Sequence, residues 1–125
     1  MPAAVLPQPS SPVSDSCLFC RIVAGEIPAQ IVAQNETCVA FRDLSPQAPL
    51  HVLVVPRQHL ASLGVATDPA LIGEVALLAA QVAREAGYAE RGFRTVVNDG
   101  ADAGQTVHHL HMHVLAGRPL AWPPG

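Results

Sequence analysis

The sequence predicts an α+β fold, in which an antiparallel sheet of about five strands packs with one long and one short helix. Three observations indicate this class. Short β-like runs follow one another in hairpin order, one long segment has helical periodicity, and a last β-like run follows that helix. The 125 residues are the size of one domain, and 50% of them are hydrophobic, which is sufficient for a core.

The N-terminal part is predicted to contain a tail and a short helix. Residues 1–14 are rich in proline and serine and lack an aromatic side chain, so we expect a disordered tail followed by one folded domain at residues 15–125. Asp15 or Ser16 is expected to cap a helix over residues 17–23, because each offers a side-chain oxygen to the first free amides.

The next segment predicts three strands. Two β-like runs, residues 31–33 and 37–41, are separated by three polar residues, which indicates a hairpin. Turn-forming residues fill positions 43–49. Residues 51–55 then predict a buried strand that ends at Pro56.

The second half predicts the long helix and the remaining strands. The helix is expected to begin at the capping residue Asp68 and to end at Gly87. Its apolar residues recur at steps of three and four: Leu71, Ile72, Val75, Leu78, Ala79, Val82 and Ala86. Residues 94–98 predict a strand, residues 98–104 a turn-rich loop, and residues 106–116 the last strand.

Composition excludes several classes of function. The formal net charge is -3, and the basic residues are seven scattered arginines, so we expect no nucleic-acid partner. The absence of lysine excludes Schiff-base chemistry and a Walker-type phosphate loop. The sequence has neither a membrane-spanning apolar run nor the pattern of a signal peptide. Three cysteines do not make a secreted disulfide framework. We therefore expect a cytoplasmic protein with no membrane partner.

The histidines carry most of the functional information. Four of the six lie within residues 108–113. Side chains of a strand alternate between its faces, so His109, His111 and His113 are expected to share one face while the intervening apolar residues face the core. His108 has the opposite parity, and we assign it no role.

Three interpretations of this histidine face stay open. It is a polar, solvated strand face, a hydrolytic zinc site built on His-x-His, or a site of nucleophilic catalysis. Crowding disfavours protonation of all the rings, so a neutral imidazole is available as a nucleophile while a protonated neighbour holds an anion. Such an array suits phosphoryl transfer.

Residues 105–115 (QTVHHLHMHVL) contain the His-φ-His-φ-His-φ-φ pattern and resemble the histidine triad (HIT) superfamily. The loop at residues 43–49, His51, Gly104 and the terminal WPPG at residues 122–125 are similar to its Hint branch, the purine nucleoside phosphoramidases. The resemblance runs from about residue 17 to the end of the chain.

The resemblance implies a homodimer with a continuous sheet that cleaves the P–N bond of adenosine or guanosine 5′-phosphoramidates, including aminoacyl adenylates. It implies that His111 is the nucleophile that forms a nucleotidyl-histidine, that His113 holds a phosphate oxygen, and that His109 and His51 orient the nucleophile. No cofactor is implied for catalysis. The implied nucleotide-binding residues are Phe19, Ile22, Phe41 and Leu44 around the base, Asp43 at the ribose, and Asn98, Gly104, Gln105, Thr106, His111 and His113 around the phosphate.

Ordinary structural explanations of several of these residues stay open. Asp43 also suits the acceptor of a turn, and Gly104 a plain turn glycine. Phe19, Ile22 and Phe41 also suit the core. Thr106 stands where the Hint branch often has serine, and it keeps the hydroxyl.

Cys17 and Cys20 form a C-x-x-C pair with three interpretations. A redox pair lacks the thioredoxin-like βαβ context, small hydrophobic residues are one alternative, and half of a zinc site is the other. The resemblance implies a structural zinc held by Cys17, Cys20, His59 and His109. Cys38 is expected in the core.

Alternative functions also follow. They are a HIT dinucleoside polyphosphate hydrolase, a non-catalytic nucleotide-binding or scaffold protein, and a hydrolase that uses zinc at the histidine face.

Overall fold

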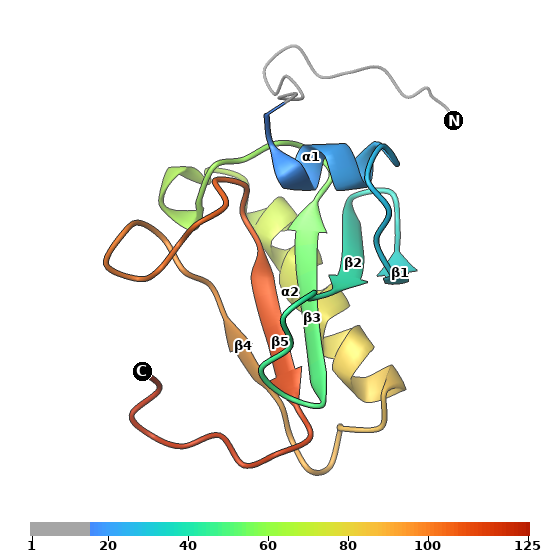
Figure 1. Ribbon diagram of the computed structural model, residues 1–125, viewed down its shortest axis with the longest axis vertical. Helices are drawn as coiled ribbons and strands as arrows, with labels where there is room; N and C mark the ends of the chain where they lie inside the picture. Colours follow the sequence, from blue (N-terminus) through green and yellow to red (C-terminus); the bar gives the residue numbers. More distant parts are fainter. Residues whose placement is uncertain (1–15) are drawn as a thin grey trace.

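The computed structural model describes residues 16–125 and has the expected α+β architecture, with one long helix packed against a twisted sheet (Figure 1). The expected tail at residues 1–14 lies outside the described residues. Along the chain the elements are α1 (Leu18–Val23), β1 (Ile31–Gln34), β2 (Cys38–Arg42), β3 (Leu50–Pro56), the 3-10 helix η1 (Leu63–Val65), α2 (Pro69–Glu85), β4 (Arg94–Val96) and β5 (Met112–Ala116).

The five strands form one antiparallel sheet in the order β1-β2-β3-β5-β4. The last strand therefore inserts between β3 and β4, and not at the edge of the sheet. β3 is buried along its whole length, as its apolar sequence predicts. His113 of β5 lies opposite Leu53 of β3, which places this histidine at the centre of the sheet.

Each face of the sheet has its own apolar cluster. On one face α2 packs against alternate residues of the strands, including Ala40, Val52, Val54 and Val114. On the other face α1 packs against the residues of opposite parity, including Val39, Phe41, Leu53 and Val55. His51 and His113 share the parity of Leu53, so the histidines lie on the α1 side.

The ends of α2 confirm the expected boundaries. Asp68 Oδ1 accepts a hydrogen bond of 2.9 Å from the Ala70 amide at the start of the helix. At the other end Gly87 has a φ of +93°, and the Tyr88 amide donates to the Ala83 carbonyl at 3.0 Å. This pattern satisfies carbonyls that the helix leaves free, and the left-handed φ favours glycine.

The last strand is shorter than the sequence suggests, and the prediction of a strand over residues 106–116 is wrong for its first half. β5 begins at Met112. The Leu110 amide donates to the Leu60 carbonyl at 2.6 Å, and the Pro56 carbonyl accepts from the His109 ring, so these groups serve loop contacts and not a β-ladder. His109 and His111 therefore precede the strand.

Two smaller predictions also need correction. The side chain that caps α1 is Cys17, whose Sγ accepts from the Cys20 amide at 3.3 Å, and not Ser16, while Asp15 lies outside the described residues. β4 ends at Val96 and not at residue 98, because the chain turns there into the loop that binds η1. Among residues 16–125 no helix is long and apolar enough to cross a membrane.

Candidate active site and metal cluster

A row of imidazole rings lies on the α1 side of the sheet. In order the rings are His59, His109, His111, His113 and His51. Neighbouring centroids are 5.0 Å apart for His59 and His109 and 5.1 Å apart for His111 and His113. Phe19 of α1 contacts His109 and His111 edge-on, with centroids at 6.0 and 5.0 Å. The expected common face is thus present, although loop backbone and not strand periodicity positions the first two rings of the triad.

The His111 ring is oriented by the backbone of the same loop. Its Nδ1 lies 2.8 Å from the His109 carbonyl, and a carbonyl accepts only, so Nδ1 carries the proton. The Nε2 lone pair is then free to attack an electrophile. The residue is only 7% exposed, which limits competing hydrogen bonds from water.

His51 and His113 form a relay with fixed proton positions. The Gln47 amide donates to His51 Nδ1 at 3.0 Å, so the proton of His51 is on Nε2. That Nε2–H donates to His113 Nδ1 at 2.9 Å. The proton of a neutral His113 is therefore on its Nε2, where it is available to an oxygen of a bound anion.

Burial keeps both rings of this relay neutral near pH 7. It lowers the pKa of His113 from 6.5 to about 4, and the neighbouring His111 and His51 act in the same direction while Asp43 opposes them. Burial also lowers the pKa of His51, again against the opposing effect of Asp43. A neutral N–H donor on His113 therefore takes the place of the protonated neighbour that the sequence predicts.

Asp43 follows β2 and has two contacts. Its Oδ1 accepts from the Ser45 amide at 2.7 Å, which is the turn contact that the sequence allows. Its Oδ2 lies 3.4 Å from His51 Nε2. The carboxylate therefore both closes the loop and borders the histidine relay.

The loop before the triad uses its own polar groups internally. The Gly104 amide donates to the Ala101 carbonyl at 3.0 Å, and the Gln105 amide donates to the Gly100 carbonyl at 3.1 Å. Gly104 has a φ of +89°, so the turn requires glycine there. Thr106 is exposed and Asn98 is half-buried, and both remain accessible to a ligand.

The residues expected around the base differ in exposure. Phe19, Ile22 and Phe41 are buried in the apolar cluster under α1, whereas Leu44 is 94% exposed. Trp122 is also largely exposed, at 80%. The first three residues belong to the core, so only the small exposed part of each side chain could contact a bound base.

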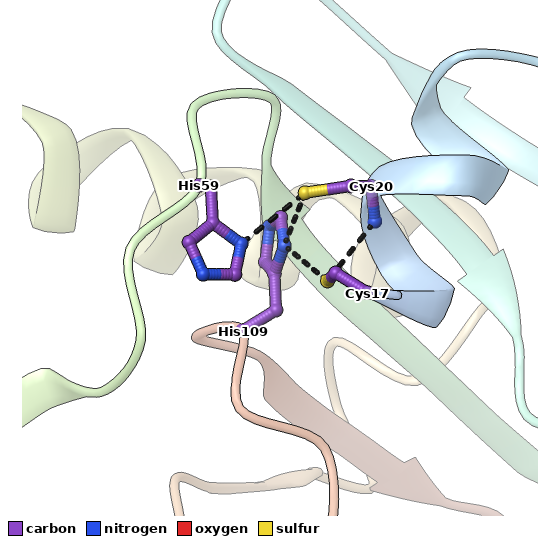
Figure 2. A group of neighbouring side chains, drawn as sticks. All are labelled: Cys17, Cys20, His59 and His109. Carbon is purple, nitrogen blue, oxygen red and sulfur yellow. Dashed lines mark hydrogen bonds between the residues drawn. The ribbon is translucent and has the colours of Figure 1, made fainter. Parts of the chain in front are cut away.

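Four side chains from three segments form a compact cluster of soft ligands (Figure 2). Their donor atoms lie within 4.8 Å of one another, and the residues are Cys17, Cys20, His59 and His109. The Cys17 and Cys20 sulfurs lie 3.4 and 3.5 Å from His109 Nδ1, and Cys20 Sγ lies 3.2 Å from His59 Nδ1. A tetrahedral zinc separates its S and N ligands by about 3.5 Å.

The hydrogen bonds of His109 fit a zinc ligand. Its Nε2 donates to the Pro56 carbonyl at 2.8 Å, which leaves the Nδ1 lone pair directed at the two sulfurs. A backbone carbonyl that accepts from the other ring nitrogen is a usual partner of a metal-bound imidazole. The four residues therefore fit a structural zinc.

A second group, Asp43, His51 and His113, also has its donor atoms within 4.8 Å of one another. It does not fit a metal, because the Gln47 amide occupies the Nδ1 lone pair of His51. Metal binding at Nε2 would then require an imidazolate or the loss of that hydrogen bond. This group is better described as a hydrogen-bond relay.

A half-open cavity of about 180 Å³ lies on the other side of the sheet, between α2 and β1 to β3. Its lining is Val32, Arg42, Leu50, Val52, Val82, Glu85 and Ala86. None of these residues belongs to the histidine row, so the cavity is separate from the candidate active site.

Sequence reasoning missed the groups that fix the ring orientations. They are the amide of Gln47 and the carbonyls of Pro56 and His109. Backbone groups are the same in every residue, so no sequence signal distinguishes them. Asp99 and the side-chain amide of Gln105 were likewise not expected to bind the segment after β3.

Known proteins resemble this chain over most of its length. The family model for the HIT domain matches residues 24–120. An uncharacterized HIT-like protein of Synechocystis is 48% identical over 115 residues, covering 90% of this chain and 100% of the relative.

Two solved structures bear on the site. A HIT family hydrolase from Legionella pneumophila has a TM-score of 0.86 and 42% identity, covering 88% of this chain and 100% of that one. A Zn-bound histidine triad family protein from Mycobacterium smegmatis has a TM-score of 0.74 and 36% identity, covering 82% of this chain and 76% of that one.

Proposed function

The chain belongs to the HIT domain family, and from that premise we propose that it is a hydrolase that cleaves the P–N bond of purine nucleoside 5′-phosphoramidates. The observation that carries the proposal is the hydrogen bond of 2.8 Å between His111 Nδ1 and the His109 carbonyl. This bond places the proton on Nδ1 and leaves the Nε2 lone pair available for attack. The similarity to a HIT family hydrolase and the Hint-like loop and C-terminus support the proposal.

The first chemical step is attack of His111 Nε2 on the α-phosphorus. A bond forms between that nitrogen and phosphorus, the P–N bond to the amine breaks, and the amine leaves with a proton from solvent. Charge increases on the non-bridging phosphate oxygens, and the Nε2–H of His113 donates to one of them. The relay from the Gln47 amide through His51 keeps this donor in place.

The second step is hydrolysis of the nucleotidyl-histidine. Water attacks phosphorus, the bond to His111 breaks, and the nucleoside monophosphate leaves. The carbonyl of His109 holds the His111 ring in one orientation through both steps, so the same lone pair is restored.

Nucleotide recognition is proposed for residues beside the relay. Asp43 accepts from the ribose hydroxyls, because its Oδ2 lies beside His51 and a carboxylate can accept two donors. Thr106 and Asn98 contact the phosphate, and the exposed side chain of Leu44 covers one face of the base. The edges of Phe19, Ile22 and Phe41 complete the wall, with Gly104 at the phosphate loop.

A structural zinc at Cys17, Cys20, His59 and His109 is part of this proposal. When bound, zinc supplies a crosslink and no hydrolytic chemistry, since all four of its positions are filled by protein ligands. His109 belongs to both sites: its ring faces the cluster while its carbonyl orients His111.

The decisive experiment replaces the nucleophile. We expect His111→Ala to lower turnover of adenosine 5′-monophosphoramidate by at least about 10³-fold, because the covalent route is lost. AMP affinity should change by no more than about tenfold, the value of one or two hydrogen bonds. The matched control is His108→Ala, which removes an exposed imidazole from the same segment and should leave turnover unchanged.

Other outcomes select the alternatives. Full activity of His111→Ala would refute covalent catalysis at this residue. The absence of a nucleotidyl adduct by intact-protein mass spectrometry, together with AMP binding, would indicate a non-catalytic nucleotide-binding module. Faster turnover of diadenosine polyphosphate than of the phosphoramidate would indicate the dinucleoside polyphosphate hydrolase.

A further inference from the structure

The segment between β3 and α2 is held by three hydrogen bonds, two to the loop before the triad and one to Leu110 within the triad segment. Asp99 Oδ2 accepts from the Gly64 amide at 2.6 Å. Gln105 Nε2 donates to the Ala61 carbonyl at 2.8 Å, and the Leu110 amide donates to the Leu60 carbonyl at 2.6 Å. This segment carries His59, the metal-cluster ligand that lies outside both α1 and the triad.

Both N–H donors of the Gln105 side chain already make hydrogen bonds within the protein. The residue is only 8% exposed, and its two N–H groups point at the carbonyls of Ala61 and Val107, at 2.8 and 3.2 Å. Its Oε1 accepts from the Gly100 amide at 2.9 Å. Binding phosphate through this amide would break at least one buried contact, which is costly.

The contact of Asp99 is equally specific. A Cβ at Gly64 would lie 2.6 Å from Asp99 Oδ2, closer than real Cβ contacts come, so the close approach needs glycine. The carboxylate therefore receives the amide at the start of η1 directly, without space for another side chain. Both contacts act on residues within five positions of His59.

We propose that Asp99 and Gln105 are positioning residues that hold His59 in the metal cluster. Neither residue is a metal ligand, and Gln105 does not bind the phosphate. A ligand on a poorly anchored segment loses conformational entropy when the metal binds, and this weakens metal affinity. Hydrogen bonds that already hold the segment reduce this loss. The inference rests on the metal site of the proposed function, and the experiment separates the two.

The experiment measures metal affinity and coordination in the full chain. Zinc affinity is measured by competition with a chelator for the wild type, Asp99→Ala and Gln105→Leu. We expect both variants to bind about tenfold or more weakly, as for other outer-shell contacts. The cobalt(II) form of each should show d–d bands shifted from those of the wild type, because water replaces the His59 nitrogen in part of the molecules.

Two further variants keep the result specific. Asp102→Ala removes an exposed carboxylate from the same loop and should bind zinc like the wild type. Asp99→Asn retains an oxygen acceptor for the Gly64 amide and should restore most of the affinity. If Gln105→Leu does not fold, the comparison of Asp99→Ala with Asp99→Asn tests the inference by itself, because Asp99 is exposed.

Two results would overturn the inference in different ways. Wild-type affinity and an unchanged cobalt spectrum in both variants would refute the positioning role while the metal site stands. A wild-type protein that binds no zinc would refute the metal site and this inference together, whatever the hydrolase activity.

Discussion

The position of one proton on each ring determines what the histidines can do. His111 has its proton held by a carbonyl, and His51 has its Nδ1 occupied by the Gln47 amide. These two contacts give opposite tautomers to two rings that both neighbour His113, so one presents a lone pair and the relay presents a donor. The roles follow from backbone atoms and not from the identity of the residue, which is histidine in each case.

The relay predicts acid sensitivity of the fold. In the unfolded chain His113 takes up a proton near its ordinary pKa of 6.5, but in the folded protein only near about 4. Between these values the unfolded state binds more protons, so the free energy of unfolding decreases as the pH falls from about 6.5 to about 4. The full effect is at most about 3 kcal/mol, and solvent screening of this partly exposed ring reduces it. Above pH 7 the contribution is constant.

Thermal denaturation from pH 7.5 to pH 4.5 tests this, with His113→Asn as the control. The Asn amide oxygen can accept from His51 Nε2 in place of Nδ1, but it does not titrate. The wild type should therefore lose stability more steeply than the variant below pH 6.5. Parallel curves would contradict the prediction. Asp43, His51 and His111 face His113 and remain in both proteins.

At the scale of elements, the start of α1 has two functions in one side chain. Cys17 Sγ accepts from the Cys20 amide and also lies 3.4 Å from His109 Nδ1. The cap and the candidate metal ligand are therefore the same atom. Serine can replace the first function and not the second, because its hydroxyl is a good cap and a poor zinc ligand.

Two substitutions of Cys17 separate its capping function from its function as a metal ligand. Without metal, Cys17→Ser should keep the wild-type free energy of unfolding within about 0.5 kcal/mol, whereas Cys17→Ala should lose about 1 kcal/mol. Both should lose high-affinity zinc, which we expect at about one equivalent per chain in the wild type. Chemical denaturation and metal analysis measure the two quantities. Retained zinc in Cys17→Ser would exclude this sulfur as a ligand.

Local signals predicted the elements well where one residue decides the boundary. Asp68 and Gly87 mark α2 in the sequence and in the structure, and Cys38 is in the core as expected. The last strand was overestimated, because alternation of His and apolar residues continues through a segment whose backbone bonds elsewhere. Its partners, Leu60 and Pro56, are about 50 residues away, and local periodicity does not detect them.

The candidate site was predictable in composition and not in mechanism. The grouping of His51 with His113, and of Cys17 and Cys20 with His59 and His109, follows the resemblance. The neutral state of His113 and the internal use of Gln105 depend on burial and on distant carbonyls. Such properties arise only when the segments assemble.

At the scale of the whole molecule, one edge of the sheet is available for assembly. β4 is the edge strand beside β5 and has only three residues, and Phe93 before it is 40% exposed. An unpaired edge readily adds another strand, and exposed aromatic residues favour interfaces. We propose that β4 pairs with its copy in a homodimer, as the family resemblance implies.

Sedimentation equilibrium tests the dimer. We expect a mass near twice 13.1 kDa for the wild type. Phe93→Lys should shift it toward the monomer, because it places a charge beside the paired edge. Val65→Lys changes an apolar residue in η1 that is even more exposed, at 59%, and should leave the dimer intact. A mass of one chain at all concentrations would refute the pairing.

The strand order sets when the protein becomes functional during its synthesis. β1, β2 and β3 can form a meander early, but β4 has no neighbour until β5 fills the place between it and β3. β5 emerges from the ribosome after the other four strands. It carries His113, and His109 and His111 come directly before it. A nascent chain therefore lacks the complete sheet until β5 has emerged, and a chain that stops before residue 112 has a split sheet and no His113 to complete the relay.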